Sequence, residues 1–191
     1  MGRITAVEHM TLDGVMQSPG RADEDTRGGF GLGGWAQPFS DPVQAEAMGE
    51  HLAGAPGALL LGRRTYQDFA GYWPHQTGNP FTEVLDKTQK YVASGTLTEP
   101  LPWQNSTLLP VDAISAIAEL RRDLDLVVLG SGDLLRSLMR HDLVDEYLLL
   151  INPTVVGTGR RLFDGVELGD LRLVASTPTT TGVIIATYQP G

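Results

Sequence analysis

Two short runs of uninterrupted apolar residues constrain what this chain can fold into more than any other feature. Ala58–Leu61 leads directly into Gly62, and Leu126–Leu129 leads directly into a second glycine-containing turn at Gly130–Gly132. Runs of this length beside glycine are typical of strands that are buried on both faces. Such strands occur in parallel sheets with helices on each side, so the chain is expected to form an α/β fold.

The predicted sheet is mostly parallel, with flanking helices and an antiparallel hairpin at its C-terminal edge. Apolar runs and alternation predict further strands at Ile4–His9, Tyr91–Ala93, Glu146–Ile151, Leu171–Ser176 and Val183–Tyr188. Capping residues and helical spacing predict helices at Asp41–Ala53 with a stop at 54–57, from Thr65 onward, at Asp112–Leu124 and at Asp133–Arg140. No composition break marks a linker, so we expect one domain over residues 1–191.

Composition excludes several classes of protein. The chain has no cysteine for disulfides or thiolate chemistry, and its four histidines lack metal-ligand spacing, so no metal site is expected. The formal net charge of −9 is opposite to the basic excess of nucleic-acid-binding proteins. No apolar stretch approaches the roughly 18 residues of a membrane helix, and no signal-peptide pattern opens the chain. A cytoplasmic protein that binds neither membrane nor nucleic acid is therefore expected.

The first turn, Gly62–Thr65, places two arginines where a strand gives way to a helix. Helix N-termini carry unsatisfied N–H groups and a partial positive charge, so Arg63 and Arg64 stand on the unfavourable side of that dipole. An anion such as a phosphate would relieve the repulsion. The alternative is that both arginines simply extend into solvent.

The second turn, Leu129–Asp133, has the same arrangement of strand, glycines and helix. Its glycines would let a phosphate backbone approach the N–H groups closely, although Leu135 stands where a dinucleotide fingerprint would have its third glycine. In an α/β sheet, ligands bind outside the carboxyl ends of the strands, and both turns lie at such ends. Together they predict one long ligand with several phosphates, for which a dinucleotide is suited.

The order of motifs along the chain resembles the dihydrofolate-reductase-like superfamily. Within it the chain is similar to the RibD C-terminal reductase domain of bacterial riboflavin biosynthesis and its stand-alone relatives. The similarity spans nearly the whole chain, through Leu12–Gly14, Leu61–Tyr66, Lys90–Ser94, Leu129–Gly132, Val144–Glu146 and Val156–Phe163. It implies a three-layer fold around a central, mostly parallel sheet, and NADPH as the usual cofactor.

The resemblance also implies cofactor-binding residues in both turns. Gly62, Arg63, Arg64 and Thr65 match the turn that grips the adenosine-side phosphates, and Ser94 matches a residue near the adenosine ribose. The turn on the pyrophosphate and nicotinamide side corresponds to Leu129, Gly130, Ser131, Gly132, Asp133 and Leu134. Folate reductases have a basic residue in place of Asp133, and an acid there would repel the 2′-phosphate. NADPH remains the expected cofactor, with NADH as the alternative.

The substrate side is less defined. Counting back from Gly62 to the helix that carries the catalytic acid of folate reductases leads to Glu46, with Glu8 and Asp13 as rivals. The long segment Gly20–Pro38 is expected to be a mobile binding loop or a disordered excursion. The resemblance places Asp13, Trp35 and Gly157 at the substrate.

The expected function is an NADPH-dependent reductase of a small pterin- or pyrimidine-like heterocycle. The reaction would be of the dihydrofolate reductase type or that of the 5-amino-6-(5-phosphoribosylamino)uracil reductase of riboflavin biosynthesis, which acts on a ribosylaminopyrimidine. The alternative is a non-catalytic nucleotide-binding or regulatory protein on the same fold. We expect a homodimer, and the apolar run Leu148–Ile151 fits either a dimer interface or burial within one subunit.

Overall fold

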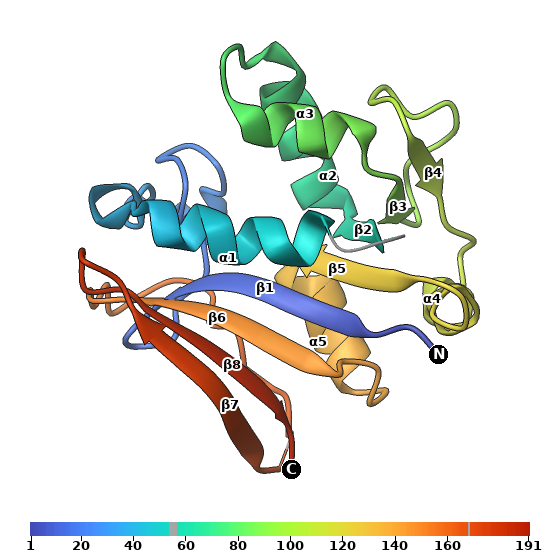
Figure 1. Cartoon of the computed structure of the whole chain (residues 1–191). Helices are drawn as coiled ribbons and strands as arrows, with labels where there is room; N and C mark the ends of the chain where they lie inside the picture. Colours follow the sequence, from blue (N-terminus) through green and yellow to red (C-terminus); the bar gives the residue numbers. More distant parts are fainter. Residues whose placement is uncertain (54–56, 168) are drawn as a thin grey trace.

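The computed structural model describes residues 1–53, 57–167 and 169–191 and contains an eight-stranded sheet with the order β4-β3-β2-β5-β1-β6-β8-β7 (Figure 1). Strands β1 to β6 run parallel, and β8 and β7 complete the sheet as an antiparallel hairpin. The predicted fold class is therefore confirmed. The strands are β1 (Ile4–Thr11), β2 (Gly57–Gly62), β3 (Lys90–Ala93), β4 (Ser106–Leu108), β5 (Asp125–Leu129), β6 (Glu146–Asn152), β7 (Leu171–Pro178) and β8 (Ile184–Pro190).

Five α-helices connect these strands within the described residues: α1 (Pro42–Ala53), α2 (Arg63–Tyr72), α3 (Pro80–Lys87), α4 (Ala113–Leu120) and α5 (Gly132–Met139). Helix α2 begins two residues before the predicted Thr65, and α3 was not predicted. The predicted helix over 112–124 is too long, because the chain needs residues 121–124 to turn into β5 at Asp125. Of the predicted stop at 54–57, residues 54–56 lie outside the described residues.

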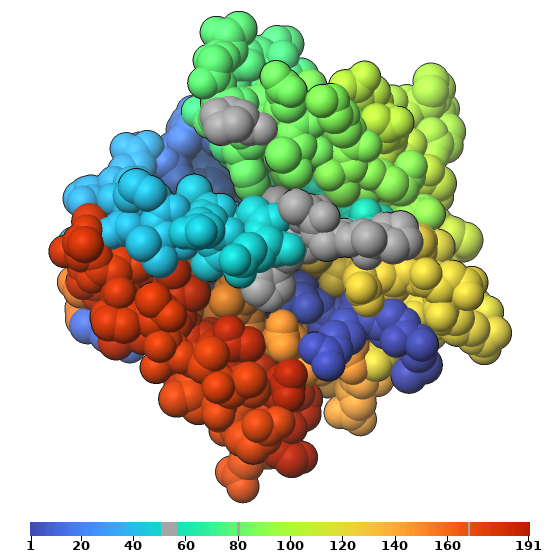
Figure 2. Space-filling model, in the orientation of Figure 1, coloured from blue at the N-terminus to red at the C-terminus, as the bar shows by residue number. Residues whose placement is uncertain are grey.

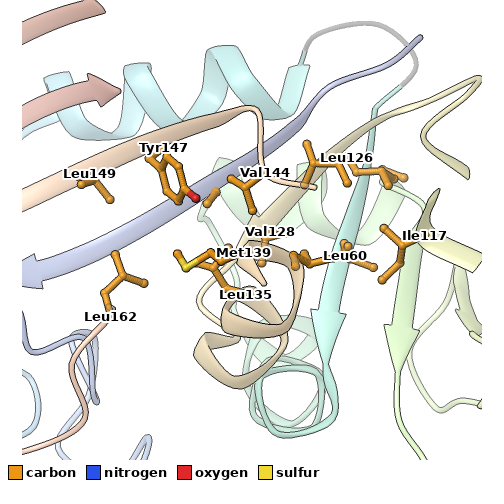
Figure 3. Packing of buried hydrophobic residues seen from close by; sticks show 14 of the residues in the cluster. Leu60, Ile117, Leu126, Val128, Leu135, Met139, Val144, Tyr147, Leu149 and Leu162 are labelled. Atoms are coloured by element: carbon orange, nitrogen blue, oxygen red, sulfur yellow. The ribbon is translucent and has the colours of Figure 1, made fainter. Parts of the chain in front are cut away.

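The central strands are buried on both faces, as their uninterrupted apolar runs predict. On β2, Ala58 and Leu60 pack with α4 and α5, whereas Leu59 and Leu61 pack on the opposite face with α1, α2 and α3. Figure 1 shows α1 on one side of the sheet and α5 on the other. Figure 3 shows the α5 side, where Leu135 and Met139 lie in one buried cluster with Val128 of β5.

The hairpin of β7 and β8 forms one edge of the sheet and is far more exposed than the centre. Every residue of β7 after Leu171 is exposed. On the face drawn in Figure 2, α1 (cyan) lies between the green segment that includes α3 and the orange-red C-terminal strands. Leu148, Leu149 and Leu150 are at most 4% exposed, so burial within one subunit accounts for this apolar run.

The long segment after β1 folds back against the body of the molecule. Val15 forms a β-bridge with Arg161, and Val15, Phe30, Trp35 and Ala36 make a small buried cluster of their own. This ordered packing differs from the predicted disordered alternative. Within the residues described, none of the helices combines the length and the apolar character that crossing a membrane requires.

Candidate functional site

A cavity of about 1000 Å³ lies along the carboxyl ends of the parallel strands. Ligands of α/β sheets bind at this edge, so it is the candidate site. The cavity extends past both glycine turns to helix α1, and the segment after β1 covers part of it. Its walls include Val7–His9, residues 16–21 and 23–27, Gln44, Met48, Gly62–Thr65, Ala93–Thr96 and Leu129–Leu134.

The two predicted turns are joined to each other by hydrogen bonds. The N–H of Gly62 donates to Ser131 Oγ at 3.0 Å, and the N–H of Ser131 donates to Thr65 Oγ1 at 3.1 Å. Gly130 and Ser131 have φ values of 56° and 61°, which turn the chain sharply from β5 into α5. Residues 62–65 and 129–134 all line the cavity, so the structure brings the predicted phosphate turns together.

Asp133, at the start of α5, is surrounded by arginines. Its carboxylate accepts from Arg136 at 2.6 Å, from Arg64 at 3.4 Å, from Arg27 at 3.5 Å, and also from Arg160. Burial alone would raise the pKa of Asp133, but the hydrogen bond from Arg136 and the charges of the nearby arginines lower it. The four arginines carry more positive charge than the Asp133 carboxylate carries negative charge, so they offset the repulsion that Asp133 alone would exert on a phosphate.

Arg63 differs from Arg64 in its surroundings. It contacts the amide oxygen of Gln67 at 3.4 Å and, in the part of the chain that is described, forms no ion pair. Ser94 lines the same cavity at the end of β3, where its Oγ accepts from the N–H groups of Thr96 and Leu97. Arg63 therefore remains available to an anionic ligand.

The end of the cavity near α1 is aromatic. Trp73 packs edge-on against Phe69 and Phe81, with ring centroids 6.3 and 5.2 Å apart. Met48 of α1 and Val7 of β1 also line the cavity. This wall has the apolar, flat surfaces that stack against an aromatic or heterocyclic ring.

Helix α1 presents Gln44 and Met48 to the cavity, one helical turn apart. Glu46 lies between them in sequence, is exposed and does not line the cavity. Gln44 is 7% exposed and donates from Nε2 to the carbonyl of Phe39 at 2.6 Å. The predicted position of Glu46 at the reacting centre is therefore wrong, because the rotation of α1 about its axis points the Glu46 side chain toward solvent.

Asp13, Trp35 and Gly157 lie away from the cavity walls. Asp13 accepts from Thr11 Oγ1 and from the N–H groups of Val156 and Gly157 at 3.2 and 2.9 Å. The bond from Thr11, together with these two backbone bonds, holds the pKa of Asp13 down to about 2. Trp35 is 8% exposed and donates from Nε1 to the carbonyl of Gln17 at 2.7 Å. The prediction that these three residues line the substrate site is therefore corrected: their hydrogen bonds connect loops to one another instead.

Two titratable residues on β1 line the cavity from opposite faces of the sheet. Burial lowers the pKa of His9 to about 4, and burial raises the pKa of Glu8 well above its usual range. Glu8 was only a rival candidate, yet its signal is in the sequence: Ala6, Glu8 and Met10 share one strand face that is otherwise apolar. Among the described residues, no group of three or more His, Cys, Asp or Glu side chains could hold a metal ion.

Comparison with known proteins places this geometry in a family. The profile of the RibD C-terminal domain matches residues 3–185. Among individual proteins, YyaP of Bacillus subtilis is 28% identical over 140 residues, which cover 69% of this chain and 72% of YyaP.

Solved structures share the fold at low sequence identity. A putative riboflavin biosynthesis protein from Shewanella has a TM-score of 0.75 at 20% identity, covering 99% of both chains. A pyrimidine reductase-like protein from Corynebacterium diphtheriae has a TM-score of 0.64 at 15% identity, covering 98% of this chain and 91% of the other. Dihydrofolate reductase from Enterococcus faecalis, complexed with NADP(H), has a TM-score of 0.62 at 15% identity, covering 98% and 96%.

Proposed function

The chain belongs to the RibD C-terminal domain family, and from this premise we propose that it is an NADPH-dependent reductase of a small, flat heterocycle. The observation that carries the proposal is the single cavity that joins two interlocked phosphate-suited turns to an aromatic wall. A dinucleotide along the turns would place its nicotinamide end toward that wall. A flat substrate between the wall and the nicotinamide ring would then be oriented for hydride transfer.

The residues around the turns fit a dinucleotide. The first turn of α5 offers N–H groups to a pyrophosphate, and Arg64 reaches the same place from α2. Arg63 and Ser94 line the cavity at the ends of β2 and β3, where an adenosine 2′-phosphate would be bound. The availability of Arg63 favours NADPH over NADH.

When bound, the reduced nicotinamide supplies the hydride, and the protein has to orient the substrate and exclude water. The aromatic wall of Phe69, Trp73 and Phe81 is suited to a pterin or pyrimidine ring, including a ribosylaminopyrimidine. The low pKa of His9 keeps its imidazole neutral at neutral pH, so it can hydrogen-bond a ring without adding charge. The names of two structural neighbours, a pyrimidine reductase-like protein and dihydrofolate reductase, are consistent with such substrates.

The proposal is tested by titrating purified protein with NADPH and, separately, NADH, followed by nicotinamide fluorescence. We expect NADPH to bind at least about tenfold more tightly, the value of one additional charge-assisted contact. Oxidation of bound NADPH is then measured with dihydrofolate, a dihydropterin and an aminopyrimidine ribotide as acceptors. Failure to bind either dinucleotide would remove the enzyme proposal.

A second candidate is a nucleotide-binding protein without catalysis. It is favoured by one observation: α1 presents an amide, Gln44, and no carboxylate to the cavity within its described side chains. Tight NADPH binding without oxidation by any acceptor would support this alternative. We also propose that the chain forms a homodimer, which light scattering coupled to size exclusion would test.

A further inference from the structure

We propose that Glu8 is the catalytic acid of this site and donates a proton to the substrate atom next to the carbon that receives the hydride. The inference rests on the proposed reductase function. It begins from the position of Glu8 on β1. Val7 is the last residue of β1 that pairs with β5, and its carbonyl accepts from the N–H of Gly130 at 3.4 Å. Glu8 is thus the first residue of β1 beside the second turn.

The surroundings of Glu8 are those of a core position. Its face of β1 is shared with Ala6, which belongs to the buried cluster on the α5 side, and Glu8 stands opposite Leu149 of β6. Glu8 itself is 3% exposed, yet it contributes to the cavity wall. Its Oε1 is buried and has no hydrogen-bond partner among the described residues. Burying a carboxyl oxygen without a hydrogen-bond partner lowers the stability of the folded protein, which indicates that Glu8 has a role other than packing.

Charged groups reach Glu8 from two elements. Arg136 of α5 is the cation, but its guanidinium already donates to Asp133 at 2.6 Å and to the carbonyl of Arg161 at 3.1 Å. Glu24, from the segment after β1, adds a negative charge. Burial outweighs the attraction of Arg136 and raises the pKa of Glu8, which favours the protonated, uncharged form of its carboxyl.

Each of the other carboxyls that line the cavity has at least one hydrogen bond or ion pair, although Asp68 Oδ2 is buried without a partner among the described residues. Asp68 accepts from Arg21, Asp25 accepts from Arg27, and Asp133 accepts from four arginines. Glu24 accepts from the N–H groups of residues 20 and 21, and Asp23 forms an ion pair with Arg21 at 3.5 Å. Among the described carboxyls that line the cavity, Glu8 is the one with neither a hydrogen bond nor an ion pair, so it is the one best placed to give a proton to a ligand.

The chemistry of the proposed reduction requires such a group. Hydride addition to a C=N or C=O carbon breaks the π bond and leaves its electron pair on the nitrogen or oxygen. Glu8 gives its proton to that atom, so that a C–H bond and an N–H or O–H bond replace the double bond. The carboxylate that remains is stabilised by Arg136 and takes a new proton from water through the cavity.

Infrared spectroscopy of the protein with and without NADPH tests the proposal without a known substrate. The variants are Glu8→Gln and, as a matched control, Glu119→Gln on the exposed surface of α4, where Glu119 pairs with Arg122. We expect a protonated-carboxyl band at neutral pH in wild type and E119Q that shifts when NADPH binds and is missing in E8Q. Identical spectra of wild type and E8Q, or a protonated-carboxyl band that does not shift when NADPH is added, would overturn the proposal.

Kinetics provide the second measurement. With an acceptor that oxidises NADPH, E8Q is expected to lower the single-turnover rate by about 10²–10⁴-fold and to flatten its pH profile. The NADPH dissociation constant should change less than about twofold, because the acid acts on the substrate. An E8Q rate equal to that of wild type would overturn the role of Glu8 and leave the reductase function intact. Absence of NADPH binding in wild type would remove both proposals.

Discussion

Acidification is expected to destabilise the protein through His9 on the cavity side of β1. The pKa of this imidazole is lowered by burial to about 4, and its Nδ1 has no hydrogen-bond partner among the described residues. In the unfolded chain the same imidazole takes up a proton near its ordinary value of 6.5. Between these two values the unfolded state binds more protons than the folded state, so stability falls as the pH falls.

The magnitude follows from the difference between the two pKa values. A difference of about 2.5 pH units, at about 1.4 kcal/mol for each unit, corresponds to about 3.5 kcal/mol. This stability is fully present above the unfolded value of 6.5 and is lost progressively as the pH falls toward about 4. It is a large fraction of the stability of an ordinary domain, which is about 5–15 kcal/mol.

The assay is urea unfolding, followed by tryptophan fluorescence, of wild type and His9→Gln at about pH 7 and about pH 4.5. Both proteins lose stability as their carboxylates take up protons, and the comparison removes this shared contribution. We expect the wild type to lose about 2–3 kcal/mol more than H9Q over this range. Equal losses would refute the reasoning and would mean that water or a polar partner solvates the imidazolium in the folded state.

Three further changes test the proposed cofactor-binding role of the two glycine turns and the packing of the core. Arg63→Ala should lower the NADPH to NADH affinity ratio by about tenfold or more, whereas Arg64→Ala should weaken both dinucleotides alike, since Arg64 lies beside Asp133; fluorescence titration distinguishes them. Gly130→Ala should lower the free energy of unfolding by about 1–2 kcal/mol, because its φ of 56° is left-handed; denaturant titration with an unchanged value would contradict this. Leu60→Ala should cost about 2–5 kcal/mol in the same assay, since Leu60 is 0% exposed, and a loss below 1 kcal/mol would mean that the core collapses around the gap.

Both glycine turns were predictable because each depends on local chemistry. A strand buried on both faces shows as an apolar run, and the glycines after Leu61 and Leu129 mark where it ends. Parallel strands end at one edge, so two such turns had to lie on the same side of the sheet. Their hydrogen-bonded contact through Ser131 is a tertiary detail that the pattern does not contain.

The substrate side was predicted less well, for two physical reasons. Glu46 and Gln44 are two positions apart on one helix, so the rotation of α1 on the sheet decides which of them meets the cavity. Asp13 and Gly157 are 144 positions apart, and their hydrogen bond forms only when the loops after β1 and β6 meet. Residue spacing in the sequence determines neither the rotation of α1 on the sheet nor the contact between the loops after β1 and β6.

The sequence by itself determined the class of fold, the antiparallel edge and the location of the phosphate-suited turns, because these depend on periodicity, glycine and the direction of parallel strands. Only the tertiary structure decided the charge balance around Asp133, where arginines at positions 27, 64, 136 and 160 converge from four separate segments. It also decided that Glu8 is an isolated buried acid, since burial and the engagement of Arg136 elsewhere are properties of the packed chain.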